Sequence, residues 1–242
     1  WEGFRTRPGL AMSQDGRNWA RIEADHHSGA LFDVGGPGAW DELYVGTPQM
    51  IASGPKDMRL YYHSFDRSRG ESGRFVVGIA NSEDGFKWSK AGVVFDPIQA
   101  GAGPGDHDAL GAASICVTRD LDNRQYVMFY EAVAADNTRS IGMAVSKDGR
   151  KGWLRCPTPV LTRPAAEAGA PAWDDGGVGA PCAVSMSAGQ WRLYYGGRRG
   201  AGAKPHTGIG LALSVGGGPT FEGMPTTFNR RVADAPPAAR TA

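Results

Sequence analysis

Acidic side chains recur at one position of this sequence. Three aspartates each stand five residues before a glycine in a similar apolar segment: Asp41, Asp106 and Asp174, before Gly46, Gly111 and Gly179. The residues that follow them are also polar: Glu42, His107 and Asp175, with Asp108 as a further acid. Carboxylates crowded in a partly dry site repel one another, which raises the pKa of at least one of them. A protonated carboxyl beside an ionised one is the pair that glycosidic cleavage requires, so this is the chemistry that the pattern predicts.

The strands that must position these acids are indicated by an internal repeat. A Gly-x-Ala-x-Ser core occurs at 9–13, 78–82, 142–146 and 210–214, with spacings of 69, 64 and 68 residues. An apolar-aromatic run precedes each of the last three cores, at 58–62, 125–130 and 190–195. Runs of this kind, bounded by Gly, Asp and Ser, are typical of strands. Each unit is interpreted as four antiparallel strands, which is the organisation of a blade, so we expect an all-β propeller.

The repeat also predicts the limits of the units. We expect a propeller over 1–232, with a partial unit at about 1–40, complete units at 41–105, 106–173 and 174–232, and an Ala/Pro-rich tail at 233–242. The chain opens in the third strand of a unit, so we expect that the inner strands of that blade are missing from this sequence.

The expected blades place the acids on a common rim. The first strand of a blade is innermost, and its start lies beside the end of the second strand because neighbouring strands run antiparallel. Glu131 ends such a second strand and joins Asp41, Asp106 and Asp174 as a catalytic candidate. The third strands start on the same rim, near Arg74, Arg139 and His206. The candidates for substrate binding are Trp40, Glu42, His63, His107, Asp108, Trp173, Asp175 and His206. The alternative for each aspartate is a turn cap, which Asp also favours.

A second set of acids is interpreted as structural. Three of the Gly-x-Ala-x-Ser cores continue into a Ser-x-Asp-Gly turn and an aromatic residue, over 13–19, 82–88 and 146–153. Gly accepts a positive φ at no steric cost, so these turns suit a tight hairpin. They fall on the opposite rim, with a Trp spaced to pack between blades.

Composition excludes several classes of function. The net charge is +1 and no Lys/Arg run is longer than two residues, so we expect no nucleic-acid partner. No stretch reaches the ~18 apolar residues of a membrane span. Cys116 and Cys182 lie in apolar strand patterns and are expected to be buried. The sequence starts at Trp1, so targeting signals do not give a compartment.

The whole unit, Asp…Gly-x-Pro…Tyr-Tyr…Gly-x-Ala-x-Ser-x-Asp-Gly-x-x-Trp, resembles a known superfamily. It is similar to the five-bladed propellers of the arabinanase, levansucrase and invertase type, especially glycoside hydrolase families 43 and 32, over residues 1 to about 225. The resemblance implies a funnel with an Asp base or nucleophile, an Asp that tunes pKa and a Glu acid. It assigns Asp41 and Asp106 as base and pKa modulator, Glu131 as acid, and Asp174 as a sugar-orienting carboxylate. The invertase-type Trp-Met-Asn-Asp-Pro signature is absent, and the family's first catalytic Asp belongs to the blade that is incomplete here.

Two hypotheses about function follow. The first is a glycoside hydrolase-like propeller that cleaves or binds a furanoside or related sugar, without a cofactor. The second is a catalytically inactive propeller that serves as a binding or scaffold subunit, with protein partners in a larger assembly. A divalent ion in the central channel, held by Asp106, His107 and Asp108, is a further alternative because imidazole and carboxylate suit such an ion.

Overall fold

The computed structural model describes residues 5–68, 73–120, 122–164, 173–186, 189–200, 207–215 and 227–230. Within these ranges the regular elements are all strands. A short hairpin comes first, with β1 at Leu10–Met12 and β2 at Ala20–Ile22. The first blade consists of β3 (Gly46–Gly54), β4 (Asp57–Asp66), β5 (Arg74–Ser82) and β6 (Ser89–Phe95). The second consists of β7 (Gly111–Asp120), β8 (Gln125–Val133), β9 (Arg139–Ser146) and β10 (Leu154–Arg155). The third consists of β11 (Gly177–Ser185), β12 (Trp191–Arg198), β13 (Thr207–Val215) and β14 (Thr227–Arg230).

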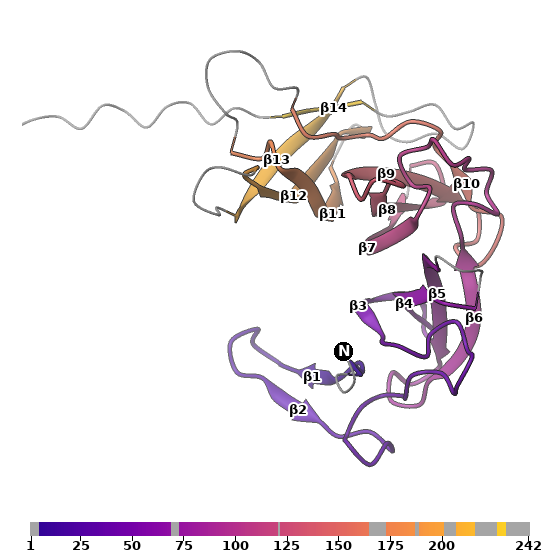
Figure 1. The fold of residues 1–242 in the computed structure, drawn as a ribbon. Helices are drawn as coiled ribbons and strands as arrows, with labels where there is room; N and C mark the ends of the chain where they lie inside the picture. The colour runs from indigo at the N-terminus through magenta and orange to yellow at the C-terminus, as the bar shows by residue number, and fades with distance from the viewer. Residues whose placement is uncertain are drawn as a thin grey trace, which may run out of the picture.

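Each blade is an antiparallel sheet in chain order. A single parallel pair, Phe75 with Gly111, joins the first blade to the second. Figure 1 shows β3, β7 and β11 toward the middle of the molecule and β6, β10 and β14 on its outside. The prediction of an all-β propeller with four-stranded blades is therefore confirmed. The domain limits stay a prediction, and the tail at 233–242 lies outside the described residues.

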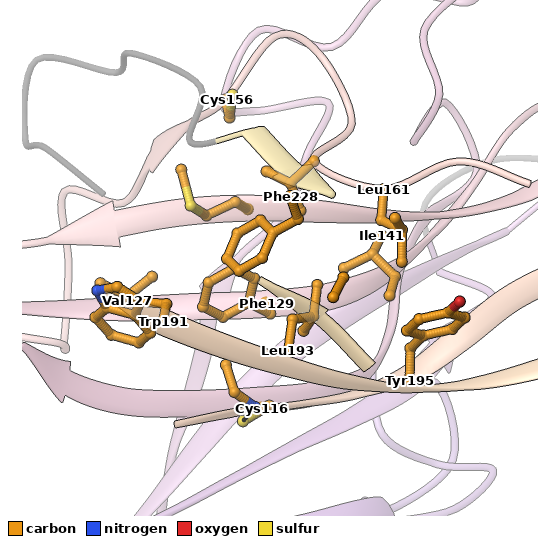
Figure 2. Packing of buried hydrophobic residues seen from close by; sticks show 14 of the residues in the cluster. Cys116, Val127, Phe129, Ile141, Cys156, Leu161, Trp191, Leu193, Tyr195 and Phe228 are labelled. Atoms are coloured by element: carbon orange, nitrogen blue, oxygen red, sulfur yellow. Dashed lines mark hydrogen bonds between the residues drawn. The ribbon is translucent and has the colours of Figure 1, made fainter. Parts of the chain in front are cut away.

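Apolar side chains between the blades form the core. Figure 2 shows Phe129 and Ile141 of the second blade against Trp191 and Leu193 of the third. A second cluster fills the space between the first and second blades. Burying a large apolar side chain contributes roughly 1.5–3 kcal/mol, so both interfaces stabilise the fold.

One expectation about the cysteines is wrong. Cys116 is buried in the core between the second and third blades, as expected, but Cys182 is exposed. Cys182 occupies the same position in β11 that Cys116 occupies in β7, and the side chain of Cys116 is covered by the blade that follows it.

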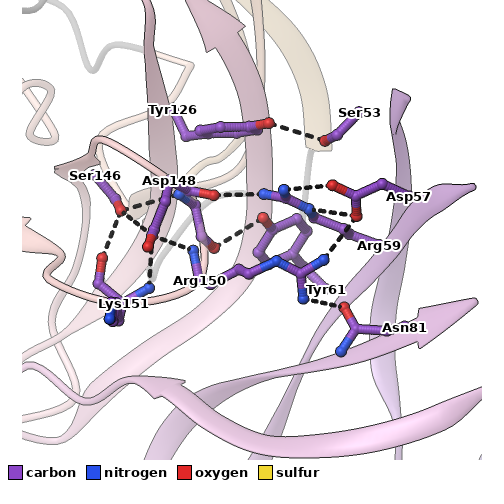
Figure 3. Close-up of polar contacts among 11 residues, drawn as sticks. Ser53, Asp57, Arg59, Tyr61, Asn81, Tyr126, Ser146, Asp148, Arg150 and Lys151 are labelled. Atoms are coloured by element: carbon purple, nitrogen blue, oxygen red, sulfur yellow. Dashed lines mark hydrogen bonds and ion pairs between the residues drawn. The ribbon is translucent and has the colours of Figure 1, made fainter.

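The Ser-x-Asp-Gly turns are structural. In the second blade the Ser146 hydroxyl accepts a hydrogen bond from Gly149 N (3.0 Å), and Asp148 accepts from two further backbone amides. The same arrangement holds the turns at 13–18 and 82–87. The second-blade turn also contacts the first blade, because Arg59 donates to the Asp148 carbonyl and Tyr61 donates to the Gly149 carbonyl (Figure 3).

Candidate functional site

The inner strands share a bulge that defines equivalent positions. Each inner strand has a residue paired with the end of the second strand, followed by a register shift: the pairs are Gly46–His63, Ala113–Glu131 and Gly179–Gly196. A residue with positive φ follows in each case, at Thr47 (φ 39°), Ser114 (φ 40°) and Ala180 (φ 45°). Such a conformation is strained for a residue other than glycine, and strained residues cluster at functional sites.

These pairs correct the alignment made from the sequence. That alignment matched Gly111 with Gly46 and Gly179, and so placed Asp106 beside Asp41 and Asp174. The pairing shows that Ala113 is the equivalent residue, two positions later. The repeated acids, five residues before it, are therefore Asp41, Asp108 and Asp174.

Each repeated acid is bonded inside its own blade. All three are buried, and each accepts a hydrogen bond from a tyrosine of the second strand and from a cation of the outer strand. The groups are Asp41 with Tyr62 and Lys90, Asp108 with Tyr130 and Arg155, and Asp174 with Tyr195 and Arg230. The hydroxyl-to-carboxylate distances are 2.9, 2.7 and 2.9 Å. A buried carboxylate needs such partners, so these groups account for the recurring acid as part of the blade itself.

The tyrosines of these groups are held protonated. Burial, with the neighbouring Asp174, raises the pKa of Tyr195 to about 12. Burial and the adjacent carboxylate also raise the pKa of Tyr62 and of Tyr130 well above the usual value. The phenol in each blade is therefore a permanent donor to its aspartate.

The other acids of the expected rim have local partners. Asp106, whose side chain is 39% exposed, accepts from Gly103 N and from Arg155, both at 3.0 Å. The hydrogen bond from Gly103, together with Arg155, lowers the pKa of Asp106. Glu42 accepts from Gly38 N and Asp175 from Gly200 N, as loop-closing acceptors.

The described aromatic and histidine candidates also have their neighbours within their own blade. Trp40 and Trp173 stack on Tyr62 and Tyr195, with ring centroids 5.2 and 5.9 Å apart. His107 is largely buried, 3.7 Å from Asp108, and burial lowers its pKa. His206 lies outside the described residues.

Glu131 lines a pocket between the second and third blades. One carboxylate oxygen pairs with Arg139 (2.8 Å), and the other accepts from the backbone amide of Ala180 (3.1 Å). A Cβ added at Gly179 would lie 2.1 Å from this second oxygen, so only glycine leaves room for the carboxylate. The described lining residues are Glu131, Arg139, Gly177, Val178, Gly179, Ala180, Gly196, Gly197, Arg198, Thr207 and Gly208.

Aromatic rings connect this pocket to the first blade. The Arg139 guanidinium lies over the ring of Phe75, 5.7 Å from its centroid. Phe75 lies 6.3 Å from the ring of His63, which also contacts the edge of Tyr44 at 5.6 Å. The site thus runs from Tyr44 through His63 and Arg139 to Glu131, across two blades.

His63 is neutral in this site at physiological pH. Its Nδ1 lies 2.9 Å from the Thr47 hydroxyl, and its ring fills the space that a Cβ on Gly46 would need. Burial lowers the pKa of His63 to about 4, and Arg139 acts in the same direction. Burial raises the pKa of Tyr44 to about 12, so Glu131 and Arg139 carry the charge of this cluster.

Sequence reasoning placed three of these residues on the expected rim and missed the other two. Glu131 and His63 were expected at the ends of second strands, and the structure connects them through Arg139 and Phe75. Tyr44 and Phe75 were missed because neither belongs to the recurring acid pattern. Arg139 was expected on the same rim, since it begins a third strand on the side where Glu131 ends a second strand.

The described ranges hold no group of three His, Cys, Asp or Glu side chains placed to bind an ion. No helix able to cross a membrane occurs in the described part of the chain.

Comparison with known proteins identifies the fold. No protein-family model and no curated protein matches the sequence. Among solved structures, a thermostable family-43 glycoside hydrolase matches 97% of this chain and 70% of its own, at 15% identity and a TM-score of 0.61. A glycosyl hydrolase from Bacteroides ovatus matches 92% of this chain and 59% of its own (18% identity, TM-score 0.57). Fructan 1-exohydrolase IIa from Cichorium intybus matches 81% of this chain and 32% of its own (17% identity, TM-score 0.56).

Several of these proteins are considerably longer than the part matched. The chain spans 57%, 59% and 50% of three others, two of them described as glycoside hydrolases and one as an N-acetylgalactosamine deacetylase. The expected resemblance is confirmed at the level of architecture. The chain has the β-propeller fold that these solved structures share.

Proposed function

We propose that this propeller binds a carbohydrate in the pocket around Glu131 and Arg139. The observation that carries the proposal is the ion pair itself, in which a partly exposed carboxylate and a guanidinium lie 2.8 Å apart at the wall of a pocket. A carboxylate accepts hydrogen bonds from sugar hydroxyls, and a guanidinium donates to their oxygens. Such a pair can therefore fix the orientation of a sugar.

The surroundings suit the same ligand. Four of the glycines in the wall, at 177, 179, 196 and 197, let a ligand approach the backbone closely. The aromatic rings of Phe75 and Tyr44 continue the site beyond Arg139. Pockets for small molecules usually combine apolar and aromatic walls with a few placed polar groups.

Cleavage of a furanoside or related sugar is the second candidate. The fold shared with solved glycoside hydrolases favours it, and Glu131 is the carboxylate we assign as general acid. Cleavage of a glycosidic bond uses two carboxyl groups. They lie ~5–5.5 Å apart in enzymes that retain the anomeric configuration and ~6.5–9.5 Å apart in enzymes that invert it. Asp41 and Asp174 are each bound to a tyrosine and a cation, so the proposal gives them a structural role.

Calorimetric titration with a panel of arabino- and fructofuranosides and pyranosides tests binding. Glu131→Gln should lose at least about tenfold in affinity for any sugar that binds, because a charged hydrogen bond is worth about 1.5–3 kcal/mol. Glu42→Gln is the matched control, since Glu42 closes a loop through Gly38. Binding that is unchanged in Glu131→Gln, or absent across the panel, contradicts the proposal. Cleavage is tested with nitrophenyl furanosides. If the unmodified chain releases nitrophenol and Glu131→Gln does not, the protein cleaves the sugar as well as binding it.

A further inference from the structure

The pocket around Glu131 holds a second guanidinium. Arg198, the last residue of β12, lines this pocket together with Glu131 and Arg139. Its Nε donates a hydrogen bond to the carbonyl of Gly176 (3.3 Å). Within the described ranges, neither of its two terminal nitrogens has a hydrogen-bond or carboxylate partner. The fork of this guanidinium is therefore available to a ligand in the pocket.

This second guanidinium gives the pocket a net positive charge. Of the described residues that line it, only Glu131, Arg139 and Arg198 are charged. Glu131 and Arg139 form an ion pair at 2.8 Å and balance each other. Arg198 is left with one positive charge that no described lining residue balances. A concave site with an excess of one sign of charge attracts ligands of the opposite sign.

The blade itself does not require an arginine at this position. Gly177 of β11 pairs with Arg198, and the equivalent pair of the second blade is Gly111 with Val133. Val133 is fully buried, so an apolar side chain serves the fold at this position. The charge on residue 198 is therefore a feature of this pocket rather than of the repeated blade.

Two glycines of β11 make room for the charged groups of the pocket. Gly177 has a φ of 146°, which residues with a side chain rarely adopt, and a Cβ there would lie 3.2 Å from Arg198 Nε. Gly179 leaves room for the carboxylate of Glu131 in the same way. The inner strand thus admits a guanidinium at one glycine and a carboxylate two residues later.

We propose that this pocket selects an acidic sugar, a uronate, whose carboxylate binds the two terminal nitrogens of Arg198. The inference rests on the proposed function, in which the pocket binds a carbohydrate. A planar guanidinium offers parallel N–H donors that match the two oxygens of a carboxylate. One unbalanced positive charge suits a carboxylate better than a phosphate group, which carries about −1.5 to −2 at neutral pH. Glu131, which Arg139 already balances, remains to accept hydrogen bonds from the hydroxyls of the same sugar.

Calorimetric titration with ligands that differ in charge tests the selection. The probes are the methyl glycosides of galacturonate and glucuronate, and their neutral methyl esters are the matched ligands. We expect each acid to bind at least about tenfold more tightly than its ester, because a hydrogen bond between charged groups is roughly twice as strong as a neutral one. This ratio should fall as salt is added, since ions screen charges in a partly open site.

Variants of two arginines on β12 assign the selection to a residue. Arg198→Gln should bring the ratio of the two affinities to about one. Arg198→Lys should keep part of it, because lysine retains the charge but not the paired donors. Arg192→Gln is the matched control, since Arg192 is an exposed arginine of the same strand that does not line the pocket. The ratio is measured within one variant, so it does not depend on the fraction of the sample that is folded.

The outcomes separate this inference from the proposed function. Equal affinity for acid and ester, or a preference that Arg198→Gln retains, overturns the selection of acidic sugars and leaves sugar binding in place. Tighter binding of galactose 6-phosphate than of galacturonate overturns the choice of a carboxylate. If neither acidic nor neutral sugars bind, the proposed function is itself contradicted, and the selection is overturned with it.

Discussion

The hydroxyl of Tyr130 donates a 2.7 Å hydrogen bond to the carboxylate of Asp108, and both groups are fully buried in the second blade. The same bond joins Tyr62 to Asp41 and Tyr195 to Asp174. Its recurrence identifies the acid that belongs to the blade, and it separates Asp108 from Asp106, two residues away.

Neighbouring aspartates should therefore differ sharply in their effect on stability. Asp108→Asn removes the fully buried charged partner of Arg155 and leaves that arginine only the partly exposed Asp106, and breaking a buried pair costs about 3–5 kcal/mol. Asp106→Asn, at a partly exposed position that shares the same arginine, should change the free energy of unfolding far less. Urea denaturation of both variants measures the difference. Equal losses would contradict the assignment of Asp108 as the repeated acid.

Gly179→Ala should disable the pocket without unfolding the chain. The new methyl would lie 2.1 Å from Glu131 Oε2 and push the carboxylate away from Ala180 N. Overpacking of this kind costs about 1–3 kcal/mol. Sugar binding by calorimetry should be lost, whereas Gly36→Ala, where a Cβ meets nothing within 4 Å, should bind normally. Retained binding in Gly179→Ala would show that the ligand lies elsewhere.

Contacts between the first and second blades should depend on Arg59 far more than on Arg150. Both arginines reach Asp57, but the Arg59 side chain is 8% exposed and the Arg150 side chain is 41% exposed (Figure 3). Arg59 also lies over the ring of Tyr126 and donates to the Asp148 carbonyl. Arg59→Met should lose about 2–3 kcal/mol and Arg150→Met less than about 1 kcal/mol. Thermal unfolding of the two variants compares them, and the reverse order would be inconsistent with this structure.

Stability should fall in mild acid because of His63. Its pKa is about 4 in the folded protein and near 6.5 when unfolded. Below pH 6.5 the unfolded chain therefore binds a proton that the folded chain does not, and the free energy of unfolding decreases by about 3 kcal/mol by pH 4. His107, whose pKa is also lowered by burial, acts in the same direction.

The variant His63→Gln isolates this contribution. The slope of stability against pH between 6.5 and 4 should become shallower in the variant, while the part due to His107 remains. Denaturant titrations at half-unit pH steps measure it. An unchanged slope would mean that His63 is accessible to water in the folded chain.

Much of the architecture could be predicted from the sequence. The Gly-x-Ala-x-Ser cores and the Tyr-Tyr runs gave the strands, because a strand that packs on both faces needs a continuous apolar run with turn residues at each end. Glu131 and His63 were found for the same reason, since antiparallel pairing fixes which strand ends meet. Cys182 was mispredicted because the apolar pattern of a strand does not show whether another blade packs on its face, and in the described part of the chain none packs on Cys182.

The sequence by itself determined the blade: its four strands, its structural Asp-Gly turns and a recurring acid before each inner strand. Only the tertiary structure decided which acid recurs, because the residue of β7 that occupies the position before the bulge is Ala113, two residues after the glycine that spacing suggested. It also decided where the site lies. Glu131 meets the amide of Ala180, 49 residues away, across an interface between blades, and no local pattern encodes a contact between separately folded sheets.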